Sequence, residues 1–331
     1  MELRTLGRTG LRVSALGFGA GAVGGLMTRG LPADQERAVA RALELGINYF
    51  DTAPIYGDGE SEKNLGRVWK ALRPAAAVGT KVRLAPEEKT RIGAGITASL
   101  EASLKRLQMD RVDLLQLHNL IEPGHPRGLD ARQVLEEVVP ALDKLRQAGK
   151  TRFVGITALG ETASLSRVVD AGVLDSAQVC LNLLNPSAAG PVPAGFPAQD
   201  FGGLLPRLRK AGAGAIVIRA LAGGALSGVE SRHAVAAPSV EPIASGADYA
   251  ADVRRGRSLQ ELVTAGHVGS VVEASLRFAL GSPEVSTILV GYSTLEHLEY
   301  AAGLPGQGPL PSAARATLDA RWRDWAQTSA T

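Results

Sequence analysis

Short runs of β-branched and other apolar residues alternate along this chain with longer amphipathic stretches, and eight such pairs can be counted. This alternation is typical of parallel strands joined by helical crossovers. Eight pairs favour a closed (β/α)8 TIM barrel over an open doubly wound sheet, whose strands usually number fewer. We therefore expect an α/β fold with one domain over residues 1–331. The expected strands are 13–20, 47–53, 77–82, 112–119, 151–157, 177–184, 215–221 and 286–292.

Several stretches between these runs carry helix signals. Within residues 87–109, apolar residues recur at the spacing that places them on one face of a helix. Ser61 predicts the capped start of the second helix. Four helical stretches are followed by a glycine at the position where a helix commonly ends with a residue in the left-handed conformation. The apolar face is Ile92, Ile96, Leu100, Leu104 and Leu107, and the cap glycines are Gly46, Gly149, Gly172 and Gly212.

The remaining segments predict additions to the barrel. Residues 3–13 are typical of a short β-hairpin, and we expect it to cap the amino-terminal face of the barrel. The segment from Pro311 predicts an extra C-terminal helix packed outside the barrel. Residues 185–199 and 227–267 are long and rich in Gly, Pro, Ser and Ala, which indicates functional or poorly ordered loops on the substrate side.

Composition excludes several classes of function. The 36 Lys and Arg residues nearly balance the 33 acidic ones, so a net charge of +3 gives little attraction to nucleic acid or an anionic membrane. One cysteine, Cys180, excludes an internal disulfide framework, and no apolar run approaches a membrane span. The histidines show no metal-ligand spacing, so no metal site is expected. We expect a cytoplasmic protein, a monomer or small homo-oligomer, with a small-molecule partner.

Four side chains with complementary chemistry stand at or just after successive predicted strands. They are Asp51, Tyr56, Lys81 and His118. In a barrel the carboxyl ends of the strands converge on one mouth. Tyrosine is a poor proton donor at neutral pH unless a cation such as Lys81 stabilises its phenolate, and Asp51 would keep a buried Lys81 charged. His118 would donate a hydrogen bond to an oxygen that gains negative charge, which suits adding a hydride to a carbonyl.

Each of the four residues also has a purely structural interpretation. A single strand-end Asp51 or Lys81 is more often part of a structural ion pair, and a lone His118 is more often a satisfied core histidine. Four such residues at successive strand ends favour the functional interpretation.

Five segments of the sequence resemble the aldo-keto reductase superfamily, and the resemblance covers nearly the full length. They are GINYFDTAPIYG from Gly46, SEKNLG from Ser61, VGTK from Val78, LQMDRVDLLQLH from Leu107 and GKTRFVGI from Gly149. The resemblance implies a barrel that binds NADP(H), with NAD(H) as the alternative, and that reduces aldehydes and ketones or oxidises alcohols. It also implies that Tyr56 is the general acid/base, tuned by Lys81 and Asp51, and that His118 orients the carbonyl.

The same resemblance implies a set of cofactor contacts. The turn of residues 221–228 resembles a loop that contacts the cofactor pyrophosphate, where glycine lets backbone amides approach phosphate oxygens. Residues 290–298 occupy the segment that commonly holds the adenosine ribose. The implied cofactor residues are Gly19, Gly21, Thr157, Gln178, Arg219, Leu221, Gly223, Gly224, Leu226, Gly291, Tyr292, Ser293 and His297.

The chain also departs from the family pattern. Thr157-Ala158 replaces a common Ser-Asn pair, Ile218 stands where an aromatic residue often stacks on the nicotinamide, and Arg219 places a charge in an apolar strand. The basic residues that hold a 2′-phosphate in many relatives are absent. The departures at Ala158 and Ile218 keep open a dinucleotide-binding, redox-sensing or regulatory subunit without turnover. A separate alternative is a lyase or isomerase that uses Lys81 to form an imine.

Overall fold

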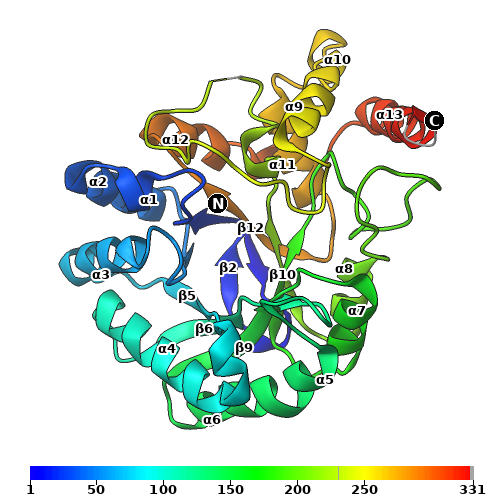
Figure 1. The fold of residues 1–331 in the computed structure, drawn as a ribbon. Helices are drawn as coiled ribbons and strands as arrows, with labels where there is room; N and C mark the ends of the chain where they lie inside the picture. The colour runs from blue at the N-terminus through cyan, green and yellow to red at the C-terminus, as the bar shows by residue number, and fades with distance from the viewer. Residues whose placement is uncertain (230, 329–331) are drawn as a thin grey trace.

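Eight parallel strands close into a barrel in the computed structural model, which describes residues 1–229 and 231–328. Each strand pairs with the next barrel strand along the chain, and the last pairs with the first. The predicted (β/α)8 architecture is confirmed (Figure 1). The strands are β3 (Leu16–Gly19), β4 (Tyr49–Asp51), β5 (Ala77–Val82), β6 (Val112–Leu117), β9 (Thr151–Thr157), β10 (Ser176–Cys180), β11 (Gly214–Ile218) and β12 (Val285–Gly291).

A ring of helices surrounds the barrel, because each strand is followed by a helical crossover (Figure 1). The predicted face of the fourth helix is buried, from Ile92 to Leu107. The four predicted cap glycines have left-handed φ values between 68° and 82°. The crossover helices are α1 (Leu26–Arg29), α2 (Pro32–Glu44), α3 (Glu60–Leu72), α4 (Ile92–Leu107), α5 (Ala131–Gln133), α6 (Val139–Gln147), α7 (Thr162–Asp170), α8 (Leu204–Lys210), α11 (Val271–Leu280) and α12 (Leu295–Ala302).

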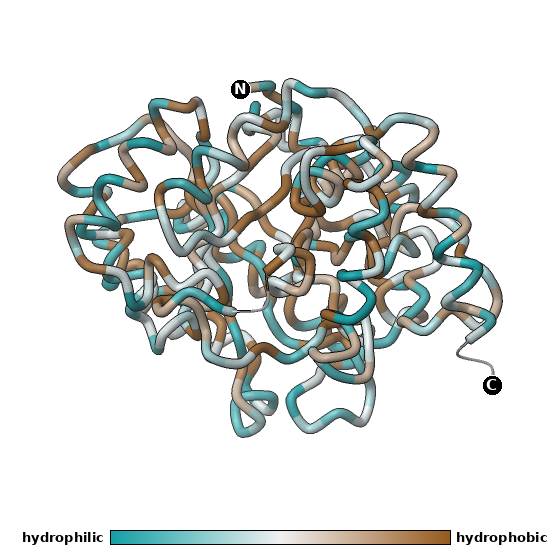
Figure 2. The backbone as a smooth tube through the Cα atoms, turned by 90° about the horizontal axis from the view of Figure 1, so that it is seen from above, coloured by the Kyte–Doolittle hydropathy of each residue, from teal (hydrophilic) through white to brown (hydrophobic). Residues whose placement is uncertain are grey.

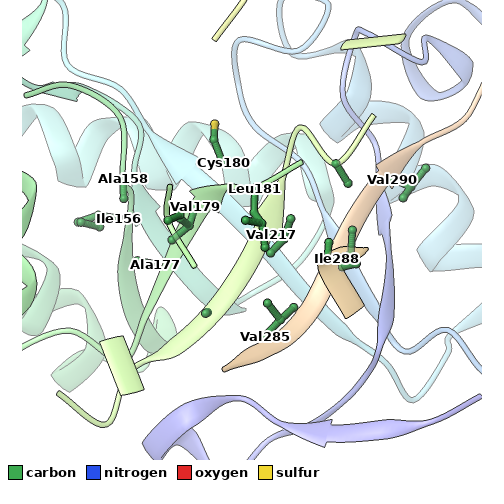
Figure 3. Close-up of a cluster of buried hydrophobic side chains, with 14 of the residues drawn as sticks. Ile156, Ala158, Ala177, Val179, Cys180, Leu181, Val217, Val285, Ile288 and Val290 are labelled. Carbon is green, nitrogen blue, oxygen red and sulfur yellow. The ribbon is translucent and has the colours of Figure 1, made fainter. Parts of the chain in front are cut away.

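Successive side chains of each barrel strand point to opposite faces, so the barrel has an outer and an inner layer. The outer layer packs against the helices and includes Val179, Val217 and Ile288 (Figure 3). Along the inner face of β4, apolar Tyr49 is followed by Asp51, so the interior becomes polar toward the carboxyl ends of the strands. Hydrophobic stretches accordingly run through the middle of the molecule (Figure 2).

An antiparallel hairpin closes the amino-terminal end of the barrel, as predicted. It consists of β1 (Leu3–Thr5) and β2 (Arg12–Ser14). Leu6 is fully buried and belongs, with Val13, to a separate apolar cluster inside the barrel. The barrel members of that cluster are Tyr49, Leu114, Ile216 and Leu289. The hairpin therefore forms a dry floor beneath the polar mouth.

Five of the predicted strands are shorter than expected. Two of them lose only end residues, because 47–53 is reduced to Tyr49–Asp51 and 112–119 to Val112–Leu117. The run 13–20 is broken between β2 and β3. The strand predicted over 177–184 ends at Cys180 and is followed by a turn in which the Asn182 side chain accepts hydrogen bonds from the backbone of residues 184 and 185. The strand predicted over 215–221 ends at Ile218 because Arg219 adopts a left-handed backbone with φ 57°.

Two further predictions about helices are wrong. Helix α3 begins at Glu60 with Gly59 as its cap, so Ser61 is not the cap residue. The Ser61 hydroxyl instead lies 2.7 Å from that of Thr52 and donates to the Ala20 carbonyl. The segment 227–267 is not all loop, since it contains α9 (Tyr249–Ser258) and α10 (Glu261–Thr264). The predicted outer helix is present as α13 (Ser312–Thr328).

The long loops and short elements lie around the mouth. Two short strands, β7 (Leu120–Ile121) and β8 (Gly128–Leu129), pair directly after β6.

Within the described residues, no helix has the length and apolar character needed to cross a bilayer.

Removing the side chain that closes the floor tests this architecture. We predict that Leu6→Ala lowers the free energy of unfolding by about 2–5 kcal/mol, because it leaves a cavity in the interior cluster. Leu3 of the same hairpin is 42% exposed, so Leu3→Ala should cost no more than about 0.5 kcal/mol. Urea denaturation measures both values, and equal losses in the two variants would contradict a hairpin floor.

Candidate active site

A buried ion pair lies at the carboxyl end of the barrel. The Lys81 ammonium donates to Asp51 Oδ2 and, over 2.8 Å, to the backbone carbonyl of Thr52. Lys81 is fully buried and Asp51 is 3% exposed. Their strands are neighbours, and Asp51 is in register with Gly79, two residues before Lys81. The register therefore brings both charges together inside the barrel.

The second oxygen of Asp51 is also satisfied. The Gln178 amide donates to Asp51 Oδ1 over 2.7 Å, and the Tyr49 hydroxyl lies 3.3 Å from the same oxygen. Gly79 leaves the room that the Tyr49 hydroxyl needs, since a Cβ there would lie 2.6 Å from it. The carboxylate is thus held by a cation and two neutral donors, which is what a buried charge requires.

The pKa values of the pair follow from burial and from mutual attraction. Burial lowers the pKa of Lys81, but the carboxylate of Asp51 and the nearby Tyr56 outweigh it and raise that pKa overall. Burial raises the pKa of Asp51, and Lys81 opposes this shift. Lys81 is therefore an ammonium ion at neutral pH.

Tyr56 lies over this ammonium. The Lys81 Nζ atom is 4.9 Å from the centroid of the Tyr56 ring. Tyr56 is half-buried on the loop between β4 and α3, and its backbone is fixed by hydrogen bonds to Ala53 and from Ser61. The Ser61 hydroxyl ties the first turn of α3 to Thr52, so the loop is held at both ends.

His118 completes the group at the mouth. Its ring meets the Tyr56 ring edge to face, with centroids 5.9 Å apart. Burial lowers the pKa of His118 well below its usual value, and Lys81 and Arg83 lower it further. The imidazole is therefore neutral at pH 7, and it still carries one N–H donor. The structure thus brings together all four of the residues that the sequence singled out.

The predicted cofactor residues on the barrel wall lie beside this group. A Cβ at Gly21 would lie 3.7 Å from the Tyr56 ring, and Gly19 is in register with Asp51. Thr157 is in register with Gln178 on the next strand. Its hydroxyl is buried and has no partner among the described residues. An orphaned hydroxyl beside the mouth fits a ligand that carries an amide or hydroxyl group.

The turn after β11 has a left-handed backbone at two glycines, and most of its amides are used within the turn, since those of Gly224 and Leu226 donate to the Leu221 carbonyl over 2.8 and 3.2 Å. Gly223 and Gly224 have φ values of 68° and 107°. Arg219 donates to the Glu241 carbonyl over 3.1 Å, and its guanidinium lies against Gly223. Burial lowers the pKa of Arg219. Leu221 is half-buried, whereas the Leu226 side chain is fully buried in the core and its amide donates to Leu221, which leaves only the Leu226 carbonyl for a ligand.

The predicted residues after β12 form a separate edge of the mouth. Gly291 is exposed, and the Ser293 hydroxyl donates to the Gly24 carbonyl over 2.7 Å. The Tyr292 ring is buried against Phe18, so its side chain belongs to the core. The backbone amide of His297 donates to the hydroxyl of the α12 cap residue, and burial lowers the pKa of its imidazole.

Sequence reasoning missed two members of the charge network, Tyr49 and Thr52. Tyr49 stands two residues before Asp51, and that spacing places both side chains on the same face of a strand. The strand period was therefore a usable signal for Tyr49. The Thr52 carbonyl carries no sequence signal, because any residue offers a backbone oxygen.

Comparison with known proteins gives consistent matches over nearly the whole chain. The model of the "Aldo/keto reductase family" matches residues 15–320. L-galactose dehydrogenase from Arabidopsis thaliana is 37% identical over 304 residues, covering 90% of this chain and 86% of that protein. Two solved structures share the fold, with each alignment covering 97% of this chain. They are aldo-keto reductase AKR11C1 from Bacillus halodurans in its holo form (TM-score 0.73, 23% identity, 96% of that chain) and an aldo/keto reductase from Klebsiella pneumoniae in complex with NADP and acetate (TM-score 0.69, 21% identity, 95% of that chain).

Removing one member of the buried pair tests the network. We predict that Asp51→Asn lowers the free energy of unfolding by about 3–5 kcal/mol at pH 7, because it leaves the Lys81 ammonium buried without a counter-ion. The double variant Asp51→Asn/Lys81→Met removes both charges and should recover part of that loss. Chemical denaturation of the wild type, both single variants and the double variant gives the coupling free energy between Asp51 and Lys81. Additive losses would show that the two charges do not depend on each other.

Proposed function

The chain belongs to the aldo/keto reductase family, and we propose that it reduces aldehydes or ketones to alcohols, with Tyr56 as the general acid. The same site run in reverse would oxidise small or sugar-like alcohols, with Tyr56 as the base. The observation that carries the proposal is the buried Asp51–Lys81 pair beneath the Tyr56 ring. A cation beside a phenol stabilises the phenolate, which makes the phenol a better acid.

In this proposal the side chains move one proton and polarise one oxygen. The substrate carbonyl oxygen lies within reach of both the Tyr56 hydroxyl and the His118 ring, because the two rings are neighbours at the mouth. The neutral imidazole of His118 donates a hydrogen bond to the carbonyl oxygen and orients it. As negative charge develops on that oxygen, Tyr56 gives up its hydroxyl proton, and the Lys81 ammonium stabilises the phenolate that remains. Asp51 keeps Lys81 charged and positions it.

The residues present fit a nicotinamide dinucleotide, which supplies the hydride when bound. The orphaned hydroxyl of Thr157 would hold the carboxamide, in place of the Ser-Asn pair of many relatives. The Gly224 amide is used within its own turn, so the Gly223 amide and the Arg219 guanidinium beside it would take the phosphates. Ser293 and His297 would lie toward the adenosine ribose. We propose NADP(H) as the cofactor, with NAD(H) as the alternative, and the NADP complex of the Klebsiella protein supports this choice.

The two other interpretations have less support. A sensor without turnover has no need of a proton donor, yet the chain keeps Tyr56 over a charged Lys81. Imine formation requires lysine as a free amine, and Asp51 raises the pKa of Lys81 instead.

Replacing the proposed acid separates catalysis from binding. We predict that Tyr56→Phe lowers kcat for aldehyde reduction by at least about 100-fold, because general acid catalysis typically contributes this much or more. The dissociation constant for NADPH, measured by fluorescence, should change less than about threefold. Steady NADPH consumption with a panel of neutral aldehydes gives the rates.

Tyr300→Phe is the matched control, because it removes a hydroxyl from an exposed residue of α12. Its rate should equal that of the wild type. Unchanged turnover in the Tyr56 variant would refute the role of Tyr56. A wild type that binds NADPH but consumes none with any aldehyde would favour the sensor.

A further inference from the structure

Two arginines at the mouth lack partners. Arg83 is half-buried and directly follows β5, while Arg127 lies between β7 and β8. Within residues 1–229 and 231–328, neither guanidinium has a hydrogen-bond, ion-pair or aromatic partner. Other arginines that lie partly inside the protein are paired, as Arg106 is with the buried Glu62 over 2.6 Å. Arg127 is exposed, whereas Arg83 is half-buried, and a half-buried arginine without a partner is unusual among the described residues.

A buried asparagine next to His118 joins the backbone segments that carry the two arginines. The Asn119 side chain accepts from the Leu84 amide over 2.8 Å and donates to the carbonyls of Leu84 (2.9 Å) and Arg127 (3.1 Å). The neighbouring His118 amide donates to the Val82 carbonyl. One side chain thus fixes the segment after β5 against the loop after β6. The backbone next to Arg83 and the backbone of Arg127 are consequently both held close to the His118 segment.

The charges of this pair are not compensated. Burial lowers the pKa of Arg83, and the charge of Arg127 lowers it further. Arg83 in turn contributes to the low pKa of His118. Arg127 is exposed, but keeping the half-buried Arg83 guanidinium without a counter-ion and near a second cation is unfavourable unless an anion joins them. An anion bound next to the proposed carbonyl position would compensate the positive charge of Arg83.

We propose that Arg83 and Arg127 bind the carboxylate or phosphate of an anionic carbonyl substrate. The inference rests on the proposed function and adds a substrate class to it. Guanidinium groups suit both anions, because their planar donors match carboxylate and phosphate oxygens. With its anion on these arginines, the substrate would present its carbonyl to His118 and Tyr56.

The position of the arginines assigns the anion to the substrate rather than to the cofactor. The glycine turn that we propose for the cofactor phosphates follows β11. In the closed barrel β11 is four strands away from β5 in either direction. Arg83 therefore stands on the opposite wall of the mouth from that turn.

Matched pairs of aldehydes test the substrate class. We expect kcat/KM to be about 10- to 100-fold higher for succinic semialdehyde than for butanal, which is the range for one hydrogen bond to a charged group. Glycolaldehyde phosphate against glycolaldehyde tests phosphate in the same way. Arg83→Met should abolish the preference and leave the neutral aldehydes unaffected. Arg83→Lys should retain part of it.

Arg111→Met is the matched control, because this exposed arginine precedes β6 at the opposite end of the barrel and its loss changes the net charge equally. It should keep the wild-type preference. A wild-type preference for neither anion, or an equal preference in the wild type and Arg83→Met, would overturn the proposal.

A binding measurement keeps the inference separate from catalysis. Calorimetric titration of the purified protein with inorganic phosphate and with succinate should show a site that weakens at least tenfold in Arg83→Met and persists in Arg111→Met. If the wild type reduces neutral aldehydes but the titrations of Arg83→Met and wild type agree, only the anion site is wrong. If the wild type reduces no aldehyde, the proposed function fails and the titration alone decides the anion site.

Discussion

The buried contact between Lys81 and Asp51 is the interaction on which the rest of the site depends. Removing two charges from water costs several kcal/mol for each ion. The cost is offset only when the charges pair closely and their other hydrogen-bonding atoms also have partners. The surrounding residues meet these conditions, because Gln178 and Tyr49 donate to the carboxylate and the Thr52 carbonyl accepts from the ammonium. The pair can therefore stay charged in the interior, directly beneath Tyr56.

The barrel supplies the conditions that this pair needs. The hairpin and Leu6 close one end of the barrel with an apolar floor, so the polar groups of the interior lie toward the mouth. The strands then deliver Asp51, Lys81 and His118 to that mouth from three neighbouring positions in the sheet. The tie between Ser61 and Thr52 fixes the loop that carries Tyr56. Stability and proposed chemistry thus share the same contacts.

Sequence reasoning succeeded where local pattern and tertiary structure agree. The strands at 77–82 and 151–157 match in full, because their apolar runs are bounded by turn residues. Sequence reasoning failed where tertiary contacts determine the role of a residue or the presence of an element. Ser61 has the composition of a helix cap, but its hydroxyl is used in the core. Helix α9 was missed because its surroundings are rich in Gly, Ser and Pro and its own face is highly charged. The lack of a partner for Arg83 has no sequence signal, because only the fold decides whether an acidic side chain lies near it.

The most direct test of the central claim is the protonation state of Lys81. Nitrogen-15 NMR of lysine-labelled protein, with the signal assigned by Lys81→Arg, follows this one amine as the pH rises. The account predicts an ammonium signal that persists above pH 10.5, the ordinary lysine pKa, because Asp51 raises the pKa of Lys81. The stabilisation by the pair would be lost only as the pH passes that raised value. A neutral amine at pH 7 would contradict the account, because Tyr56 would then have no cation beside it.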